Sequence, residues 1–468
     1  MDDSSTKRRA KTAQPRVIGT AGGLAIVMGA MVGIGIFITP AQVASHLPTP
    51  SLYLLAWLFG GLIAFAGATV YAELGTRFPE AGGDFVFLRE AFGADLSFAA
   101  GWLLFIGVFT GSVATMAVPI AQYQLPVLLE PFGTFSPNAV VASAGVIELT
   151  VARAVGIGII GLLTVLNILG TRLSTNAQIV LTGIPVVVLS IGAIYIFATS
   201  SAAPVEAPPV EDPLTINFGR AVLAVYFAYA GWNAIAYVGG EMKQPSTTMP
   251  RSLLGGTVAI TLLYILLAGA FVYALGIADL QQAMEAGTAT AHAVGSDATA
   301  YVVTLLIASA LIGSLNGTVL AGGRVAMAMA RQDALPSSIG KLHSRFKTPT
   351  AALLLQGALA ALFVLTGTFE ILLELTSIAM LLMSALTVVA LFQIRRRDGT
   401  EAPYQATFYP FLPAFFLVTS LLVIGASIYR ALSPEYGYSV DSLYPLLGLM
   451  IFVLIWAAAR LRRAFSSW

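Results

Sequence analysis

The chain contains three short stretches in which glycine interrupts an apolar run: Gly33-Ile34-Gly35-Ile36-Phe37, Phe227-Ala228-Tyr229-Ala230-Gly231-Trp232-Asn233 and Gly313-Ser314-Leu315-Asn316-Gly317. The first two lie in segments that are too apolar to be loops. A bilayer offers no water to a backbone group that a helix break sets free, so such a break survives only where it is buried in protein or lines a cavity. The sequence therefore predicts two broken membrane helices, and paired breaks of this kind indicate the substrate site of a secondary transporter.

The composition is that of a membrane protein. Hydrophobic residues make up 57% of the 468 residues, charged residues make up 10%, and the mean hydropathy is +0.85. A soluble domain carries about a quarter charged residues, so most of this chain is expected to lie in lipid. There is no cysteine, which excludes disulfides, thiol catalysis and cysteine-ligated metals. The net charge of +1 gives no indication of nucleic-acid binding.

Apolar runs predict an all-α integral membrane protein. About 20 apolar residues span a bilayer, and twelve such runs are predicted, at residues 18–45, 52–74, 96–125, 154–168, 177–199, 216–240, 253–275, 298–330, 350–366, 371–393, 411–429 and 444–461. The first run is too long for a straight span, and its central glycines favour a break. Residues 202–213 and 281–297 are predicted to be solvated loops.

Basic residues predict the orientation. Of the 24 Lys and Arg residues, 21 fall in the N-terminal segment, in connections from even-numbered to odd-numbered spans, or in the C-terminal tail. The three exceptions are Arg153, Arg220 and Arg430. Positive charge concentrates on the cytoplasmic side, so both termini are predicted to be cytoplasmic. Residues 1–16 lack the apolar region of a signal peptide, so the first span is expected to remain in the mature protein in the cytoplasmic membrane.

Four ordered motifs carry a resemblance to a known family. They are the first break with Thr39-Pro40, the stretch from Tyr71 to Gly93, the second break with Glu241 and Pro250-Arg251, and Ser314-Leu315-Asn316-Gly317 with Arg324 and Leu335-Pro336. Together they resemble the amino acid–polyamine–organocation (APC) superfamily, most closely prokaryotic members of its L-type amino acid transporter (LAT) branch. The resemblance covers the first ten predicted spans.

The resemblance implies a 5+5 inverted-repeat fold with twelve transmembrane helices, of which helices 1 and 6 are discontinuous. The first repeat would be residues 17–199, the second residues 214–394, and two accessory helices would follow at residues 411–461. Residues 1–16 and 462–468 would be cytoplasmic tails.

The two predicted helix breaks offer backbone groups that can bind both charged groups of an amino acid zwitterion. The half-helix after Gly33 and Gly35 presents free N–H groups and about half a positive charge, which favour a carboxylate. Unwound carbonyls in both breaks favour an ammonium group. A Cβ would block backbone approach at these glycines, although glycine in a membrane helix can equally serve close helix packing. The predicted substrate-binding residues are Met31, Val32, Gly33, Ile34, Gly35, Phe227, Ala228, Ala230, Gly231 and Asn233.

Several polar and aromatic residues have two interpretations each. The resemblance implies that Phe227 is a gate over the substrate, whereas alone it would be a packing residue. Asn233 either faces substrate or bonds another helix. Ser314 and Asn316 either support the first span or contact ligand, with support favoured, and Trp232 is expected to pack.

Glu73 and Glu241 are ionisable residues near the ends of predicted spans. Two roles are considered for them, proton coupling and a structural salt bridge to Arg77, Lys243 or Arg324. No histidine lies inside a span, and the spans contain no metal-ligand, nucleophile or phosphate-loop pattern. We therefore expect no enzymatic activity, no cofactor and no metal.

The chain departs from the L-type pattern at two positions and lacks one residue type. Pro185 stands where many relatives carry a lysine in the fifth span, so the coupling role of that lysine cannot be transferred. Ile34 replaces a smaller or polar residue between the two glycines. Because there is no cysteine, the disulfide-linked heavy subunit of eukaryotic members is excluded.

The predicted function is transport of neutral L-amino acids by alternating access, by exchange or proton coupling and without sodium. The predicted partners are a small-molecule amino acid and the bilayer, with no nucleic acid. An amine or polyamine transporter is one alternative, and a non-transporting amino-acid sensor of the same fold is another. A channel is disfavoured because no charged or carbonyl-ring filter motif is visible.

Overall fold

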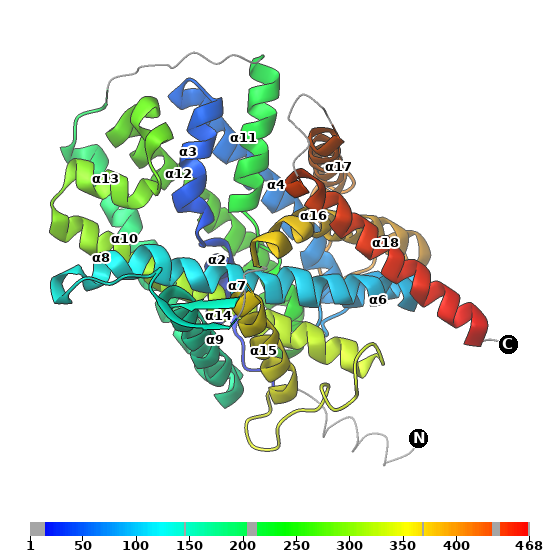
Figure 1. Ribbon diagram of the computed structural model, residues 1–468. Coiled ribbons are helices and arrows are strands. Elements are labelled where there is room, and N and C mark those ends of the chain that lie inside the picture. Colours follow the sequence, from blue (N-terminus) through cyan, green and yellow to red (C-terminus); the bar gives the residue numbers. More distant parts are fainter. Residues whose placement is uncertain (1–14, 145–146, 204–212, 367–368, 433–439, 467–468) are drawn as a thin grey trace.

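The computed structural model describes residues 15–144, 147–203, 213–366, 369–432 and 440–466, which are almost entirely helical (Figure 1). The first half contains α2 (Thr20–Met31), α3 (Gly35–His46), α4 (Pro50–Arg77), α5 (Asp84–Phe92), α6 (Ala94–Trp102), α7 (Ser112–Pro119), α8 (Leu125–Leu129), α9 (Val151–Leu169) and α10 (Thr171–Thr199). The second half contains α11 (Leu214–Ala228), α12 (Pro245–Gln282), α13 (Ala286–Val294), α14 (Asp297–Arg331), α15 (Thr350–Thr366), α16 (Phe369–Asp398), α17 (Phe411–Leu432) and α18 (Val440–Ser466).

The first predicted break is confirmed. The helices α2 and α3 are separated by Val32, Gly33 and Ile34, and their axes are bent by 44°. Val32 leaves the helical conformation with a ψ of 79°, whereas Ile34 already has helical dihedral angles. The break is therefore short, and it lies where an apolar run meets two glycines.

The sixth predicted span is also broken. The helix α11 ends at Ala228, and Gly231 follows with a φ of +101°, a conformation that L-residues rarely adopt. After this turn the chain forms two short 3-10 segments, η4 (Ala234–Tyr237) and η5 (Gly239–Glu241), before α12. The second half of this span is thus compact and irregular rather than a second α-helix.

The third glycine-containing stretch lies inside an unbroken helix, because α14 runs from Asp297 to Arg331 without interruption. The third predicted span forms one helical run, Ala94–Phe132, that includes the π-helical segments η1 (Leu103–Gly111) and η2 (Ile120–Gln124). Only two of the three glycine-containing stretches therefore mark helix breaks.

Two connections differ from a simple loop. Residues 281–297 contain α13, so the prediction of a loop there was wrong. The Glu285 side chain accepts hydrogen bonds from the Gly287 and Thr288 N–H groups and starts this helix. A two-stranded antiparallel hairpin, β1 (Val140–Ala144) with β2 (Ile147–Thr150), precedes α9. Most of the other predicted loop, residues 204–212, lies outside the described residues.

Six described helices are long and apolar enough to cross a bilayer, and the bent pair α2–α3 makes seven. Four shorter apolar helices or helix segments accompany them, including α11 and α15. The helix α10 is strongly apolar, yet it leaves Val180, Ile184, Val187 and Ile191 exposed on the protein surface. An outward apolar face of this kind is suited to lipid. The broken helices lie inside, where α12 packs against α2, α3 and α4.

Candidate functional site

The ends of three helices meet at one place in the core. The hydroxyl of Tyr264, on α12, lies 2.6 Å from the Met31 carbonyl oxygen at the end of α2 and 3.1 Å from the Ala228 carbonyl oxygen at the end of α11. Both helix C-termini therefore lie within hydrogen-bond distance of one phenol oxygen. The N-terminus of α3 lies beside them, because Gly35 packs directly against Ala228.

Two of the predicted site glycines are required by close packing of these helix ends. A Cβ at Gly231 would lie 2.5 Å from the Ala30 carbonyl oxygen, and a Cβ at Gly35 would lie 2.7 Å from the Ala228 Cα. Real Cβ atoms do not approach other atoms this closely. The glycines therefore bring the breaks of the two spans into backbone contact, and the packing interpretation accounts fully for Gly35.

Gly33 differs from these two residues. A Cβ there would meet the Ser314 Oγ at 3.5 Å and the Met31 carbonyl oxygen at 3.9 Å, which are ordinary contact distances. The following helix, α3, begins at Gly35 without a side-chain cap and without an acidic residue in its first turn. An uncapped helix N-terminus carries partial positive charge and free N–H donors. The break at Gly33 thus places the uncapped N-terminus of α3 beside a residue that has no close contact at its Cβ position.

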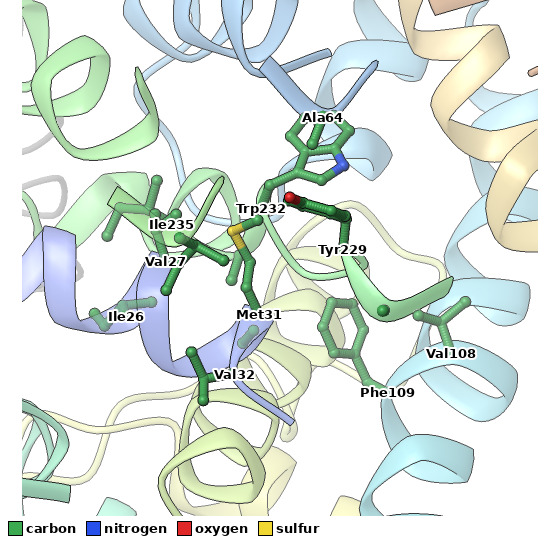
Figure 2. Close-up of a cluster of buried hydrophobic side chains, with 14 of the residues drawn as sticks. Ile26, Val27, Met31, Val32, Ala64, Val108, Phe109, Tyr229, Trp232 and Ile235 are labelled. Atoms are coloured by element: carbon green, nitrogen blue, oxygen red, sulfur yellow. The ribbon is translucent and has the colours of Figure 1, made fainter. Parts of the chain in front are cut away.

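Apolar side chains surround the breaks (Figure 2). Met31, at the end of α2, extends toward Tyr229 and Trp232 from the segment after α11, and Phe109 from η1 lies nearby. Trp232 is 5% exposed and packs edge-on against Tyr71 and Phe416, as expected for a packing residue.

The remaining predicted site residues take different positions. Val32 is buried, Ile34 is the residue before α3, and Ala230 donates its N–H to the Phe227 carbonyl oxygen. The Phe227 side chain, the predicted gate, is 45% exposed. Asn233 is half-buried, and its Nδ2 donates to the Tyr237 hydroxyl at 3.3 Å within the same segment.

A buried polar cluster packs against α2, the first half of the first span. The Asn316 side chain donates to the Gln178 Oε1 at 2.7 Å and accepts from Asn167 at 2.9 Å. Gln178 donates to Thr182, and a Cβ on Gly29 of α2 would lie 2.0 Å from the Gln178 amide nitrogen. Asn316 thus joins α14, α9 and α10, while Gln178 and Thr182 lie against α2.

Ser314 lies closer to the break than Asn316 does. Its Oγ is 3.5 Å from the Ala30 carbonyl oxygen and 3.7 Å from the Met116 sulfur. Pro185 is buried in α10, one of the helices that pack against α2. Gln178 and Thr182 are polar side chains that α10 places against α2, as is Thr175 beside Gly22, and the sequence pattern did not identify them.

Comparison with known proteins identifies the family. The sequence model of the amino acid permease family matches residues 18–458. The chain belongs to this family. It is 30% identical to the serine/threonine exchanger SteT of Bacillus subtilis (strain 168), with 88% of this chain and 91% of the exchanger aligned. It is 28% identical to b(0,+)-type amino acid transporter 1 of Mus musculus, covering 97% and 93% of the two chains, and 26% identical to mouse Asc-type amino acid transporter 1, covering 89% and 79%.

These matches confirm the resemblance to the APC superfamily and its L-type branch, and the protein is an amino acid transporter with several membrane spans. The permease has no cysteine anywhere in its sequence, so no partner subunit can be linked to it by a disulfide.

Buried ion pairs hold the two acidic residues that sequence analysis singled out. Glu241 bonds the Arg324 Nε at 2.8 Å, and both side chains are almost fully buried. Glu73 bonds the Arg77 Nη2 at 2.9 Å and the Arg395 Nε at 2.9 Å. Two of the suggested salt-bridge partners are therefore present, and Arg395 adds a third guanidinium from α16.

Sequence reasoning did not identify two buried residues near the breaks. Tyr264 bonds both helix ends, and Asp84 lies at the start of α5 next to Tyr237. An acidic residue directly after Gly82-Gly83 was the available signal for Asp84, because it starts a helix. Among the described residues of the permease, no group of three or more His, Asp or Glu side chains is arranged to hold a metal ion.

Proposed function

We propose that the permease exchanges neutral L-amino acids across the cell membrane by alternating access, and that the two helix breaks bind the amino and carboxyl groups of the substrate. The observation that carries this proposal is the meeting of three helix ends at Tyr264, Ala228 and Gly35. Two helix C-termini and one helix N-terminus place partial negative and positive charge side by side without a charged side chain. That pattern matches a zwitterion.

The carboxylate would lie at the uncapped N-terminus of α3, beside Gly33. The ammonium group would lie at carbonyl oxygens near the ends of α2 and α11. The Met31 carbonyl oxygen already accepts from the Gly33 N–H at 2.8 Å and lies 2.6 Å from the Tyr264 hydroxyl. The carbonyl oxygens of neighbouring residues are therefore better acceptors for the ammonium group. Phe227 would close the site from outside, and Asn233 would select the substrate side chain. Apolar Met31 and Trp232 nearby favour a neutral substrate.

The proposed architecture has twelve spans, with repeats at residues 17–199 and 214–394, accessory helices at residues 411–461 and both termini in the cytoplasm. It is supported by breaks at corresponding places in the two halves, since inverted repeats place a discontinuous helix in each. The bias of basic residues supports the orientation.

Counterflow tests the function. Because one relative is a serine/threonine exchanger, purified permease in liposomes should take up labelled L-serine faster when the liposomes contain unlabelled L-serine than when they are empty. The stimulation should be about tenfold and equal in sodium and choline buffers, because the described structure pairs its buried carboxylates with guanidinium or hydroxyl groups.

The same liposomes should be tested with L-alanine, L-leucine and putrescine inside. Stimulation by putrescine alone would support an amine carrier instead, and binding without any counterflow would support a sensor. A several-fold stimulation by sodium at constant membrane potential would contradict sodium independence.

A further inference from the structure

Asp84 is a buried carboxylate held entirely by hydroxyl groups. It is 1% exposed and is the first residue of α5, between two candidate spans. Its oxygens accept hydrogen bonds from Tyr71 on α4, Tyr237 on η4 and Thr387 on α16, the last at 2.6 Å. Four separate parts of the chain therefore meet at this one carboxylate.

The other two buried carboxylates near this end of the bundle are different. Glu73 and Glu241 each pair with a guanidinium group, whereas the described residues show no basic partner for Asp84. Taking an unpaired carboxylate out of water favours its neutral form. Burial accordingly raises the pKa of the Asp84 carboxyl, and the hydrogen bonds from Thr387, Tyr237 and Tyr71 oppose that rise. Hydroxyl groups can donate or accept, so the cluster can satisfy either protonation state.

The ionisable groups that lie against the Asp84 carboxyl are two phenols. The phenols of Tyr71 and Tyr237 donate to it, and among the described side chains of α16 its hydrogen-bond partner is the Thr387 hydroxyl. Arg89 and Glu90 on α5, Asp95 on α6 and Arg331 on α14 belong to the same packed elements, but none of them contributes to the shift at Asp84.

The carboxylate lies in a junction between α5 and the segment after the second break. The Gly82 N–H donates to the Tyr237 carbonyl oxygen at 3.0 Å, and Ala81 forms an isolated bridge with Val238. The Tyr237 hydroxyl also accepts from Asn233, one of the proposed substrate residues. Asp84 is therefore connected to the proposed substrate site by one hydrogen-bonded tyrosine.

We propose that Asp84 is a proton-binding site that controls opening of the junction between residues 81–84 and 237–239. This rests on the proposed transport function, because it assigns a proton to the conformational cycle. In the closed arrangement Asp84 is buried and holds its proton. When the junction opens, water reaches the carboxylate and the proton is released. Protonation thus favours the closed arrangement, and raising the pH favours opening.

Accessibility of a single cysteine tests this directly, because the chain has no cysteine of its own. Ala81→Cys places a thiol at the junction. Its rate of reaction with an impermeant maleimide should be measured in membranes open on both sides. Dividing this rate by the rate for the same variant after denaturation at each pH removes the effect of thiol ionisation.

The normalised rate should rise at least about threefold between about pH 5.5 and about pH 8.5 in the Asp84-containing protein. It should be independent of pH when Asp84→Asn is added, since the amide does not titrate, while its oxygen can accept from the surrounding hydroxyl groups and its NH2 group can donate to them. Asp398→Asn, at an exposed ion pair, is the matched control and should keep the full rise. An equal pH dependence with and without Asp84→Asn would overturn the proposal.

Thr387→Val gives a second test that keeps the carboxylate. It removes one hydrogen bond that stabilises the charged form, so the midpoint of the normalised rate should move upward by about one pH unit. An unchanged midpoint would contradict the proposal even if Asp84→Asn failed to fold. Labelling requires no amino acid, so failure of counterflow and failure of this test can be distinguished.

Discussion

Gly231→Ala is expected to reduce amino acid exchange at least tenfold, to about a tenth or less of the wild-type rate. The new Cβ would lie 2.5 Å from the Ala30 carbonyl oxygen, and the residue would keep a φ of +101°. Backbone strain costs about 1–3 kcal/mol, and forcing an atom into a packed core costs a similar amount. The segment after α11 would therefore move away from α2, and the helix ends would no longer meet.

Counterflow in liposomes and thermal unfolding in detergent should be measured together for Gly231→Ala. Gly219→Ala is the matched control, because it lies on α11 with nothing within 4 Å of its Cβ position. The control should retain wild-type exchange and thermal stability. Wild-type exchange by Gly231→Ala would show that close contact between the two breaks is not needed.

Glu241→Gln is expected to destabilise the fold strongly, although glutamine has nearly the same shape as glutamate. It leaves the fully buried Arg324 guanidinium without its carboxylate, although Arg324 keeps its bond to Thr171 at 2.8 Å. Removing one partner of a buried ion pair costs about 3–5 kcal/mol, because the remaining charge is uncompensated. The measurement is the midpoint of thermal unfolding, followed by the fraction of protein that remains monodisperse.

Arg397→Met is the control for Glu241→Gln. Arg397 and Asp398 form an exposed pair, and exposed pairs of this kind contribute little to stability. Combining Glu241→Gln with Arg324→Met should recover part of the lost stability, since both charges are then removed. A thermal midpoint for Glu241→Gln as high as that for Arg397→Met would contradict a structural role for the buried pair.

The helix breaks could be predicted from sequence because their causes are local. Glycine within a long apolar run has few other outcomes in a bilayer, and both Gly33 and Gly231 lie at observed breaks. The partner of Glu73 at Arg77 could also be anticipated, because residues four apart share one helix face. Local spacing thus accounts for these results, whereas the suggested pairing of Glu241 with Arg324 is a long-range contact.

Long-range contacts explain what sequence analysis missed. Tyr264 lies in an ordinary apolar span, and only the fold brings its hydroxyl to the ends of α2 and α11. The partners of Asp84 come from three other elements, including Thr387 far along the chain. Gly35 appeared equivalent to Gly33, but the two differ because only Gly35 faces the Ala228 backbone.

The central claim is that the backbone at the first break binds the amino acid. Equilibrium binding of labelled L-serine to purified Gly33→Val tests it most directly, with Gly158→Val as control because its Cβ position on α9 has no neighbour within 4 Å. Thermal unfolding should be measured for both variants, so that affinities are compared between folded proteins, and a Cβ at Gly33 itself meets only ordinary contacts. We expect affinity to fall about 100-fold or more in Gly33→Val and to be unchanged in Gly158→Val. Wild-type affinity in a folded Gly33→Val protein would contradict the account.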